Sequence, residues 1–197
     1  MKEIIAIILT AALVNNYVLS QFLGICPFLG VSKKLDQATG MSIAVIFVML
    51  LATAVTWPIQ YYVLNANGLG YMQTIVFILV IAILVQLLES FLKKFIPSLY
   101  AALGVYLPLI TTNCAILGVT ILNIDNGYNF VESIVCAAGA GIGFLLAMVL
   151  FSGVRRKVEA AKPPKCFEGL PITLVAAAMT SMSFMGFGGI VSAIFGV

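Results

Sequence analysis

Two cysteines in matching surroundings are the residues of this chain whose type and spacing could do chemistry. Cys26 lies in the stretch GICPFLGVS and Cys114 opens the stretch CAILGV, so both copies read C-x-x-L-G-V. Thiolates bind zinc, hold iron–sulfur clusters or form disulfides. A structural zinc site or a [2Fe–2S] cluster takes four protein ligands, usually cysteines when His is absent. The motif pair supplies two, so a complete site needs two more thiolates from a second chain or a twofold axis through the site.

Other uses of these cysteines stay open at this point. A lone cysteine in an apolar segment is most often a small packing residue, but two in matching, glycine-flanked positions favour a ligand role. A disulfide between Cys26 and Cys114 is an alternative, although it would have no evident role within a membrane. Cys136 and Cys166 repeat no motif. The chain contains no His, which excludes haem held by His, Rieske-type clusters and His-rich zinc sites.

The composition identifies the class of protein that must position these thiols. The chain has 197 residues, of which 62% are hydrophobic and only 9% charged, against about 25% charged residues in soluble domains. A spanning helix needs about 20 apolar residues, and backbone groups that face lipid must pair within the chain. We therefore predict an all-α polytopic membrane protein with six transmembrane helices. The six apolar segments are Ile4–Gly24, Met41–Leu64, Tyr71–Leu92, Leu99–Leu122, Val131–Val154 and Leu170–Phe195.

Lysines and arginines predict the orientation of these helices. They follow the first, third and fifth segments, so nine of the ten lie on one side of the membrane and only Lys2 on the other. Basic residues are retained on the cytoplasmic side, which predicts cytoplasmic basic loops and both termini outside. The nine residues are Lys33, Lys34, Lys93, Lys94, Arg155, Arg156, Lys157, Lys162 and Lys165.

The spacing of the two motifs predicts an internal repeat. Cys114 lies 88 positions after Cys26, so each half of the chain, 1–97 and 98–197, holds three spans. An odd number of spans makes the second half enter the membrane from the opposite side. Inverted repeats of this kind place functional sites near the midplane, on broken helices. We expect the first helix of each repeat to be broken, because Pro27 lacks a backbone donor and Gly24, Gly30 and Gly118 permit bends.

A polar cluster precedes each cysteine inside an apolar segment. These side chains could sense a change of charge at the thiols, or they could only satisfy the backbone of the broken helices. The clusters are Asn15, Asn16 and Gln21 before the first cysteine and Thr111, Thr112 and Asn113 before the second.

Four stretches together resemble a known family over essentially the whole chain. They read LVNNYVLSQFLGICPFLGVSKKL, PLITTNCAILGV, FVMLLATAVTWPI and MSFMGFGG. The sequence is similar to the family of membrane proteins that includes the A subunit of the Rnf complex. That complex is an ion-translocating ferredoxin:NAD oxidoreductase, and its A subunit is related to the E subunit of the sodium-pumping NADH:quinone reductase.

The resemblance implies a role in electron and ion transport within the cytoplasmic (inner) membrane of a bacterium or archaeon. It implies pairing with the homologous E subunit of the Rnf complex in opposite orientation, each of the two giving two cysteines to one intramembrane [2Fe–2S] cluster. By motif, the ligands here are Cys26 and Cys114. The resemblance further implies partner subunits that carry flavins and iron–sulfur clusters, a role in catalysis only as part of that complex, and either Na⁺ or H⁺ as the transported ion.

Neighbours of the cysteines are expected to tune the site or couple it to ion movement, since hydrogen bonds to the sulfurs set a cluster's potential. Two other functions remain in competition with electron transfer. Inverted repeats with broken helices also describe secondary transporters, and the chain could serve as a structural membrane anchor for redox partners. The residues expected around the thiols are Gly24, Pro27, Gly30, Thr112, Asn113 and Gly118.

Overall fold

The computed structural model describes residues 7–32, 35–95, 110, 112–161, 164 and 168–195, and within these ranges all regular secondary structure is helical. Two elements are π-helical turns, one is a 3₁₀ turn, and the rest are α-helices. In chain order they are η1 (Thr10–Val14), α2 (Ile25–Val31), α3 (Leu35–Ile59), η2 (Gln60–Leu64), η3 (Gly70–Met72), α4 (Gln73–Phe95), α7 (Cys114–Asp125), α8 (Phe130–Ala160) and α9 (Leu170–Phe195).

Three helical stretches are long and apolar enough to cross a membrane. They are Leu35–Leu64, Gly70–Phe91 and Phe130–Ala160, which correspond to the second, third and fifth segments expected from the sequence. Two shorter apolar helical stretches, Cys114–Asp125 and Leu170–Gly186, belong to the fourth and sixth segments. The all-helical class is confirmed, and the apolar helices are those of a membrane protein. Part of the fourth segment, 99–109, lies outside the described residues, as do Lys2, Lys33, Lys34, Lys162, Lys165 and Cys166.

The first segment is not one continuous helix. Its π-helical turn ends with the Asn15 amide donating to the Thr10 carbonyl at 2.7 Å. The chain then turns irregularly until α2 begins at Ile25, and Phe22 has a positive φ of 57° within this break. The break therefore lies directly before the first motif.

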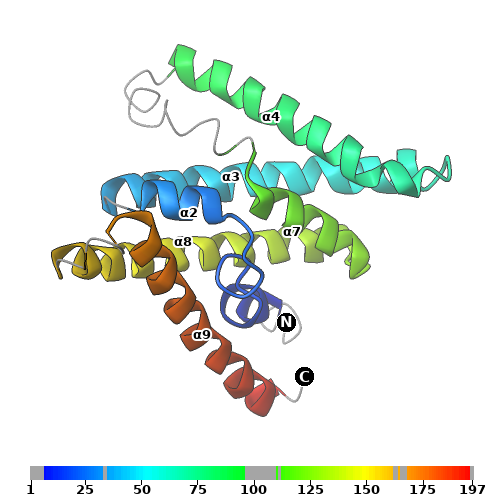
Figure 1. The fold of residues 1–197 in the computed structure, drawn as a ribbon. Coiled ribbons are helices and arrows are strands. Elements are labelled where there is room, and N and C mark those ends of the chain that lie inside the picture. Colours follow the sequence, from blue (N-terminus) through cyan, green and yellow to red (C-terminus); the bar gives the residue numbers. More distant parts are fainter. Residues whose placement is uncertain are drawn as a thin grey trace.

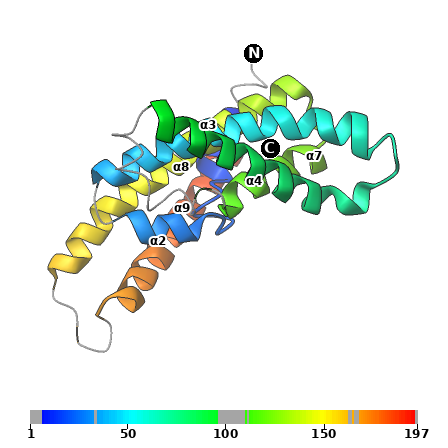
Figure 2. The ribbon, with the colours of Figure 1, turned by 90° about the horizontal axis from the view of Figure 1, so that it is seen from above.

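The helices α3 and α8 form the centre of the molecule and pack along each other in opposite directions (Figure 1). Their contact is built from Ala, Val, Met and Phe side chains. Helix α3 also packs against α4, which lies over it when the molecule is viewed from above (Figure 2). The fully buried residues of this contact are Ala38, Met41, Val45, Met49, Ala52, Ala137, Phe144, Ala147, Met148 and Phe151.

Glycines on α8 allow the first segment to approach unusually closely. A Cβ built at Gly139 would lie 3.1 Å from the Ile8 Cα, and one at Gly143 would lie 2.8 Å from the Ala12 carbonyl oxygen. The stretch GAGIG thus mediates close helix packing through small residues, which is a common way for helices to associate in lipid.

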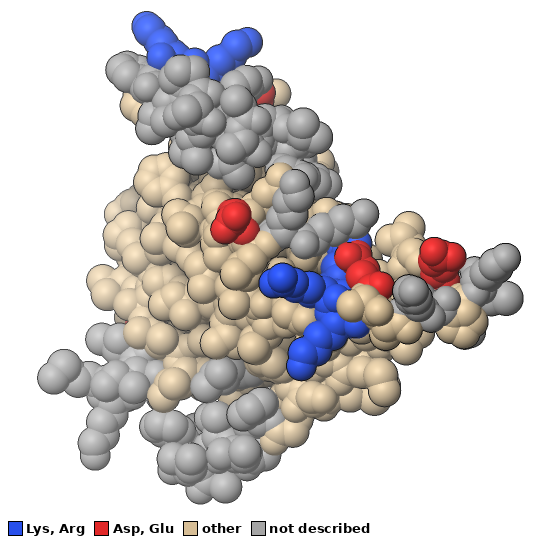
Figure 3. Space-filling model, turned by 90° about the vertical axis from the view of Figure 1, so that its left-hand side faces the viewer, with Lys and Arg blue, Asp and Glu red and all other residues tan. Residues whose placement is uncertain are grey.

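The outer face of α4 is apolar rather than charged. Ile75, Leu79, Ile83, Leu87 and Phe91 are each more than half exposed on this helix. Lipid requires such a surface on a spanning helix, because charged side chains are costly in hydrocarbon. Basic residues lie instead at the C-terminal ends of two helices. Helix α4 has Lys93 and Lys94 in its last turn, and α8 has Arg155, Arg156 and Lys157 near its end. Figure 3 shows Lys and Arg side chains of both ends on one face.

Candidate cofactor site at two facing helix starts

Asn16 organises the break in the first segment. It is 1% exposed, and its Nδ2 donates to the carbonyls of Gly143, at 2.9 Å, and Ala12, at 3.2 Å. Its Oδ1 accepts from the backbone amides of Val18 and Leu19 at 3.1 and 3.3 Å. The side chain therefore bonds backbone groups of the broken segment at Ala12, Val18 and Leu19 and joins that segment to Gly143 of α8, which agrees with the structural interpretation of the first polar cluster.

Gly24 is required at the start of α2 for two physical reasons. It is the N-cap of that helix with φ 83° and ψ 25°, a left-handed conformation that glycine adopts without steric cost. A Cβ at this position would also lie 3.1 Å from the Ala115 Cβ, 3.1 Å from the Asn113 Oδ1 and 3.2 Å from a ring carbon of Phe144. The first motif thus begins pressed against the second.

The second motif begins a regular capped helix. Asn113 is the N-cap of α7, and its Oδ1 accepts from the Ala115 amide at 3.1 Å. Cys114 is the first residue of this helix. Its Sγ accepts a hydrogen bond from the Gly24 amide, with 2.9 Å between nitrogen and sulfur. This bond directly joins the two copies of the motif.

The contact between the copies is reciprocal. A Cβ at Gly118 would lie only 2.5 Å from the Leu23 Cδ1, so the Leu23 side chain packs into the space that this glycine leaves open. From this common point α2 and α7 run in opposite directions, as Figure 1 shows. The structure therefore places Gly24 against Asn113 and Cys114, and Leu23 against Gly118.

The two motif cysteines differ in exposure. Cys26 is in the first turn of α2 and is exposed, whereas Cys114 is partly buried, and both are free thiols. The disulfide alternative is thus not found among the described cysteines. Pro27 is also in the first turn, where an amide would lack a helical partner, so its missing donor costs no hydrogen bond. Gly30 lies exposed inside the same helix, so the bend expected there falls earlier, at Gly24.

Arg155 fixes the far end of α2, although the sequence indicates it only as a topological signal. Its side chain is 6% exposed and donates through Nη1 to the Leu29 carbonyl and, at 2.8 Å, to the Ser32 Oγ. Its Nε pairs with the Glu159 carboxylate at 3.1 Å. A basic residue beside a basic loop gives no sequence signal for this role, because the contact depends on where α2 lies against α8.

A cavity of about 300 Å³ adjoins Cys114. Asn113, which is 4% exposed, lines it, and its Nδ2 has no hydrogen-bond partner among the described residues. Among the other polar residues expected from the sequence to precede the cysteines, Asn15 and Gln21 are exposed, and Thr111 lies outside the described part of the chain. The other lining residues are Ile78, Ile81, Ala82, Thr112, Cys114 and Leu117.

These residues fit half of a four-thiolate iron–sulfur site. The Cys114 sulfur already receives an amide hydrogen bond, as cluster sulfurs do, and the exposed Cys26 is accessible to a second chain. Within the described ranges no three or more Cys, Asp, Glu or His side chains gather as a metal site. The motif pair contributes two free thiols among the described residues, fewer than the four ligands that such a site takes.

Comparison with known proteins identifies the family of this chain. Residues 4–191 match the family described as "Rnf-Nqr subunit, membrane protein". The chain is 58% identical over 186 residues to the A subunit of the Na(+)-translocating ferredoxin:NAD(+) oxidoreductase complex of Acetobacterium woodii, covering 94% of this chain and 97% of that protein. It is 53% identical over 191 residues to the A subunit of the ion-translocating oxidoreductase complex of Syntrophotalea carbinolica, covering 97% and 99%. The chain belongs to the Rnf-Nqr family of membrane subunits.

Proposed function

We propose that this chain is the electron-transferring A subunit of an ion-translocating ferredoxin:NAD oxidoreductase complex, in which Cys26 and Cys114 supply two thiolates to a [2Fe–2S] cluster shared with the homologous E subunit. The names of the relatives support the assignment to such a complex. The observation that carries the ligand assignment is the hydrogen bond from the Gly24 amide to the Cys114 sulfur, because it unites the two motifs at one point.

The residues of the site would bind, orient and tune the cluster. Gly24 would stabilise negative charge on the Cys114 sulfur through its amide, and Arg155 would hold α2, and with it Cys26, in place. Asn113 offers a further unpartnered donor beside Cys114. The cluster would supply a one-electron carrier inside a hydrocarbon layer about 30 Å thick, between the flavin and iron–sulfur subunits on its two sides.

The same proposal includes the finer architecture predicted from the sequence. Six spans would form two inverted three-helix repeats, 1–97 and 98–197, in the cytoplasmic (inner) membrane, with both termini outside. The opposite directions of α2 and α7 from their shared starting point support an inverted relation (Figure 1). The described lysines and arginines lie in two groups on the same face of the molecule, which supports one cytoplasmic face (Figure 3).

Coupling to Na⁺ or H⁺ movement would follow from charge at this site. An added electron in a low-dielectric interior favours a compensating cation or conformation. Asn113 is the buried polar side chain next to Cys114 that keeps an unpartnered group. We therefore expect Asn113→Leu to retain electron transfer and to lower ion transport per electron in vesicles, and unchanged coupling would refute this role.

Purification of the whole complex with cysteine variants tests the ligand assignment. Cys26→Ser and Cys114→Ser should each abolish the visible absorbance and electron paramagnetic resonance signal of the shared cluster. Cys136→Ser is the matched control, because that thiol is buried on α8 with its Sγ 3.9 Å from the Tyr17 hydroxyl and lies outside the motif pair. The control should keep the signal.

Two other functions make different predictions in the same experiment. A structural anchor would retain full electron transfer after either motif cysteine is replaced. A secondary transporter would move its substrate in vesicles without any electron donor. Either result would refute the proposed role of the thiols.

A further inference from the structure

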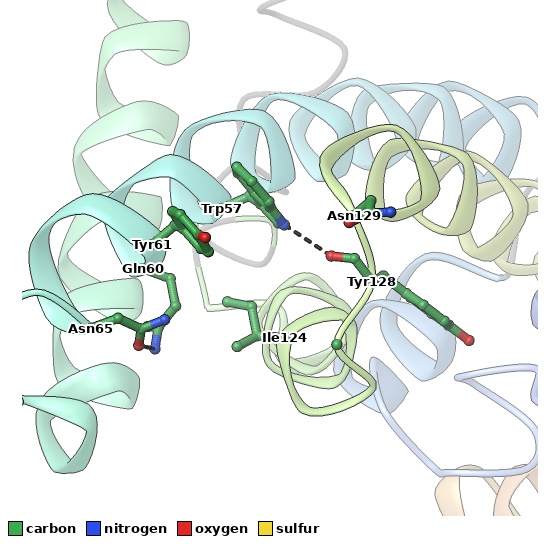
Figure 4. Close-up of a pocket in the computed structure, with 8 residues that line it drawn as sticks. Trp57, Gln60, Tyr61, Asn65, Ile124, Tyr128 and Asn129 are labelled. Atoms are coloured by element: carbon green, nitrogen blue, oxygen red, sulfur yellow. Dashed lines mark hydrogen bonds between the residues drawn. The ribbon is translucent and has the colours of Figure 1, made fainter.

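A second cavity lies at the opposite end of α7 from Cys114, about 15 Å along the helix by its rise per residue. Its volume is about 220 Å³, which gives room for an ion and several waters. The end of α3, the π-helical turn η2 and the turn between α7 and α8 form its walls (Figure 4). The lining residues are Trp57, Gln60, Tyr61, Asn65, Ile124, Gly127, Tyr128 and Asn129.

A buried oxygen without a partner marks this cavity as a site. Gln60 is 6% exposed, and its Nε2 donates to the Asn65 Oδ1 at 3.1 Å. Its Oε1 is buried and has no hydrogen-bond partner among the described residues. Buried side-chain oxygens are rarely left unpaired in proteins. A bound cation or a hydrogen-bond donor would give this oxygen the partner that it lacks.

The local backbone is arranged to place Gln60 here. Pro58 lies inside the last turn of α3, where it has no amide to donate and its ring crowds the preceding turn. The helix then widens into the π-helical turn, which the Asn65 amide closes on the Gln60 carbonyl at 2.9 Å. Single π-helical turns are uncommon and occur frequently at functional sites.

The charges around the cavity favour a cation. The C-terminal ends of η2 and α7 meet there, and helix C-termini carry partial negative charge. The N-terminus of α8 also reaches the cavity at the lining residue Asn129, and the Glu132 carboxylate, which accepts from the Asn129 amide at 2.9 Å, offsets its partial positive charge. None of the lining residues is Lys or Arg, and the described basic residues lie near the C-terminal ends of α4 and α8.

We propose that this cavity binds a partly hydrated monovalent cation, with Gln60 Oε1 and Asn65 Oδ1 as its protein oxygens. Divalent cations prefer carboxylate ligands, whereas the side-chain oxygens in this cavity belong to amides and to Tyr hydroxyls. The site is separate from the cysteine pair, so it stands whether or not a cluster is bound there.

The chain carries its own reporter for this site. Trp57 is its only tryptophan, and it lines the cavity with its Nε1 donating to the Tyr128 carbonyl at 3.0 Å (Figure 4). The indole ring also stacks on Tyr61, with 5.4 Å between ring centroids. An ion that reorganises these groups would change the emission of Trp57.

The test is a fluorescence titration of the full-length chain in detergent micelles, with NaCl against choline chloride at constant ionic strength. We expect a saturable change of emission with Na⁺ and none with choline. Gln60→Leu should raise the half-saturating Na⁺ concentration by about tenfold or more, because it removes a hydrogen-bonding ligand of a charged group. Gln86→Leu, which removes an exposed amide from α4, should leave the titration unchanged.

A second variant keeps the test decisive if Gln60→Leu does not fold. Gln60→Glu places a carboxylate in the cavity, so the half-saturating Na⁺ concentration should fall and Ca²⁺ should begin to give a response. A merely structural glutamine would show neither effect. The absence of a saturable Na⁺ response in the unmodified chain, an equal response to choline, or unchanged titrations in the Gln60 variants would each overturn the proposal.

Discussion

Replacing Gly24 by Ala should separate the two facing helix starts. A left-handed backbone costs an L-residue about 1–2 kcal/mol, and Gly24 has φ 83°. The added Cβ would also lie 3.1 Å from the Ala115 Cβ, which is fixed to the α7 backbone and cannot rotate away. Overpacking of this kind costs about 1–3 kcal/mol. Together these terms favour the separated arrangement by about 3 kcal/mol, or roughly a hundredfold in equilibrium constant.

Alkylation of the full-length chain by N-ethylmaleimide, followed by mass spectrometry of the cysteine peptides, measures this separation. In the unmodified chain the exposed Cys26 should react faster than the partly buried Cys114, whose sulfur accepts the Gly24 amide. In Gly24→Ala the rate at Cys114 relative to Cys26 should rise by about tenfold, less than the full equilibrium effect because Cys114 is already partly accessible.

Gly40→Ala is the matched control for this experiment. A Cβ at Gly40 meets nothing within 4 Å, and this residue lies in a regular helix, where Ala is favoured over Gly. Its Cys114 reactivity should equal that of the unmodified chain. If Gly24→Ala also left the ratio of the two thiols unchanged, the hydrogen bond to Cys114 would not hold the motifs together, and the reasoning from their contact would be refuted.

Three further changes test other contacts by thermal unfolding in detergent, each expected to lower the midpoint. Arg155→Met removes the donor to the partly buried Leu29 carbonyl and to the buried Ser32 hydroxyl and should cost about 2–4 kcal/mol, whereas the exposed Arg156→Met should cost little. Gly143→Ala drives a Cβ to 2.8 Å from a backbone oxygen and should cost about 1–3 kcal/mol, whereas Gly153→Ala, with nothing within 4 Å, should not. Asn16→Leu removes the four hydrogen bonds of its side chain and should cost about 2 kcal/mol or more; an unchanged midpoint in any of the three would contradict the corresponding contact.

The long apolar helices can be predicted because hydropathy alone determines them, but their ends are less certain from sequence. Helix α8 continues to Ala160 rather than Val154, since its last turns are good helix formers with an Arg155–Glu159 pair at the favourable i,i+4 spacing. Helix α3 begins at Leu35 rather than Met41. Gly40 therefore lies inside the helix, although a glycine at the edge of an apolar segment is typical of a boundary.

The repetition of the motif predicts that the two copies share one site, but it does not predict which contacts join them. The repeated pattern identified Cys114 and Gly118, yet only the folded chain shows that Leu23 fills the space left by Gly118. Gln60 was missed because a single amide in an apolar segment carries no spacing signal. Its burial beside a π-helical turn appears only after packing with α7.

The two ends of α2 show why the short helix can keep an exposed thiol in place. At its start, Gly24 is held by the Cys114 sulfur, and at its end the Leu29 carbonyl is held by Arg155 of α8. A helix of seven residues has little stability of its own, so its position must come from these two anchors. Helix α8 also contacts the broken segment before α2, because Gly143 packs against the Ala12 backbone and accepts a hydrogen bond from Asn16. Helix α8 therefore contacts the chain on both sides of Cys26. A shift of α8 would move Cys26 relative to Cys114, and a change of charge at the two thiols would in turn act on α8.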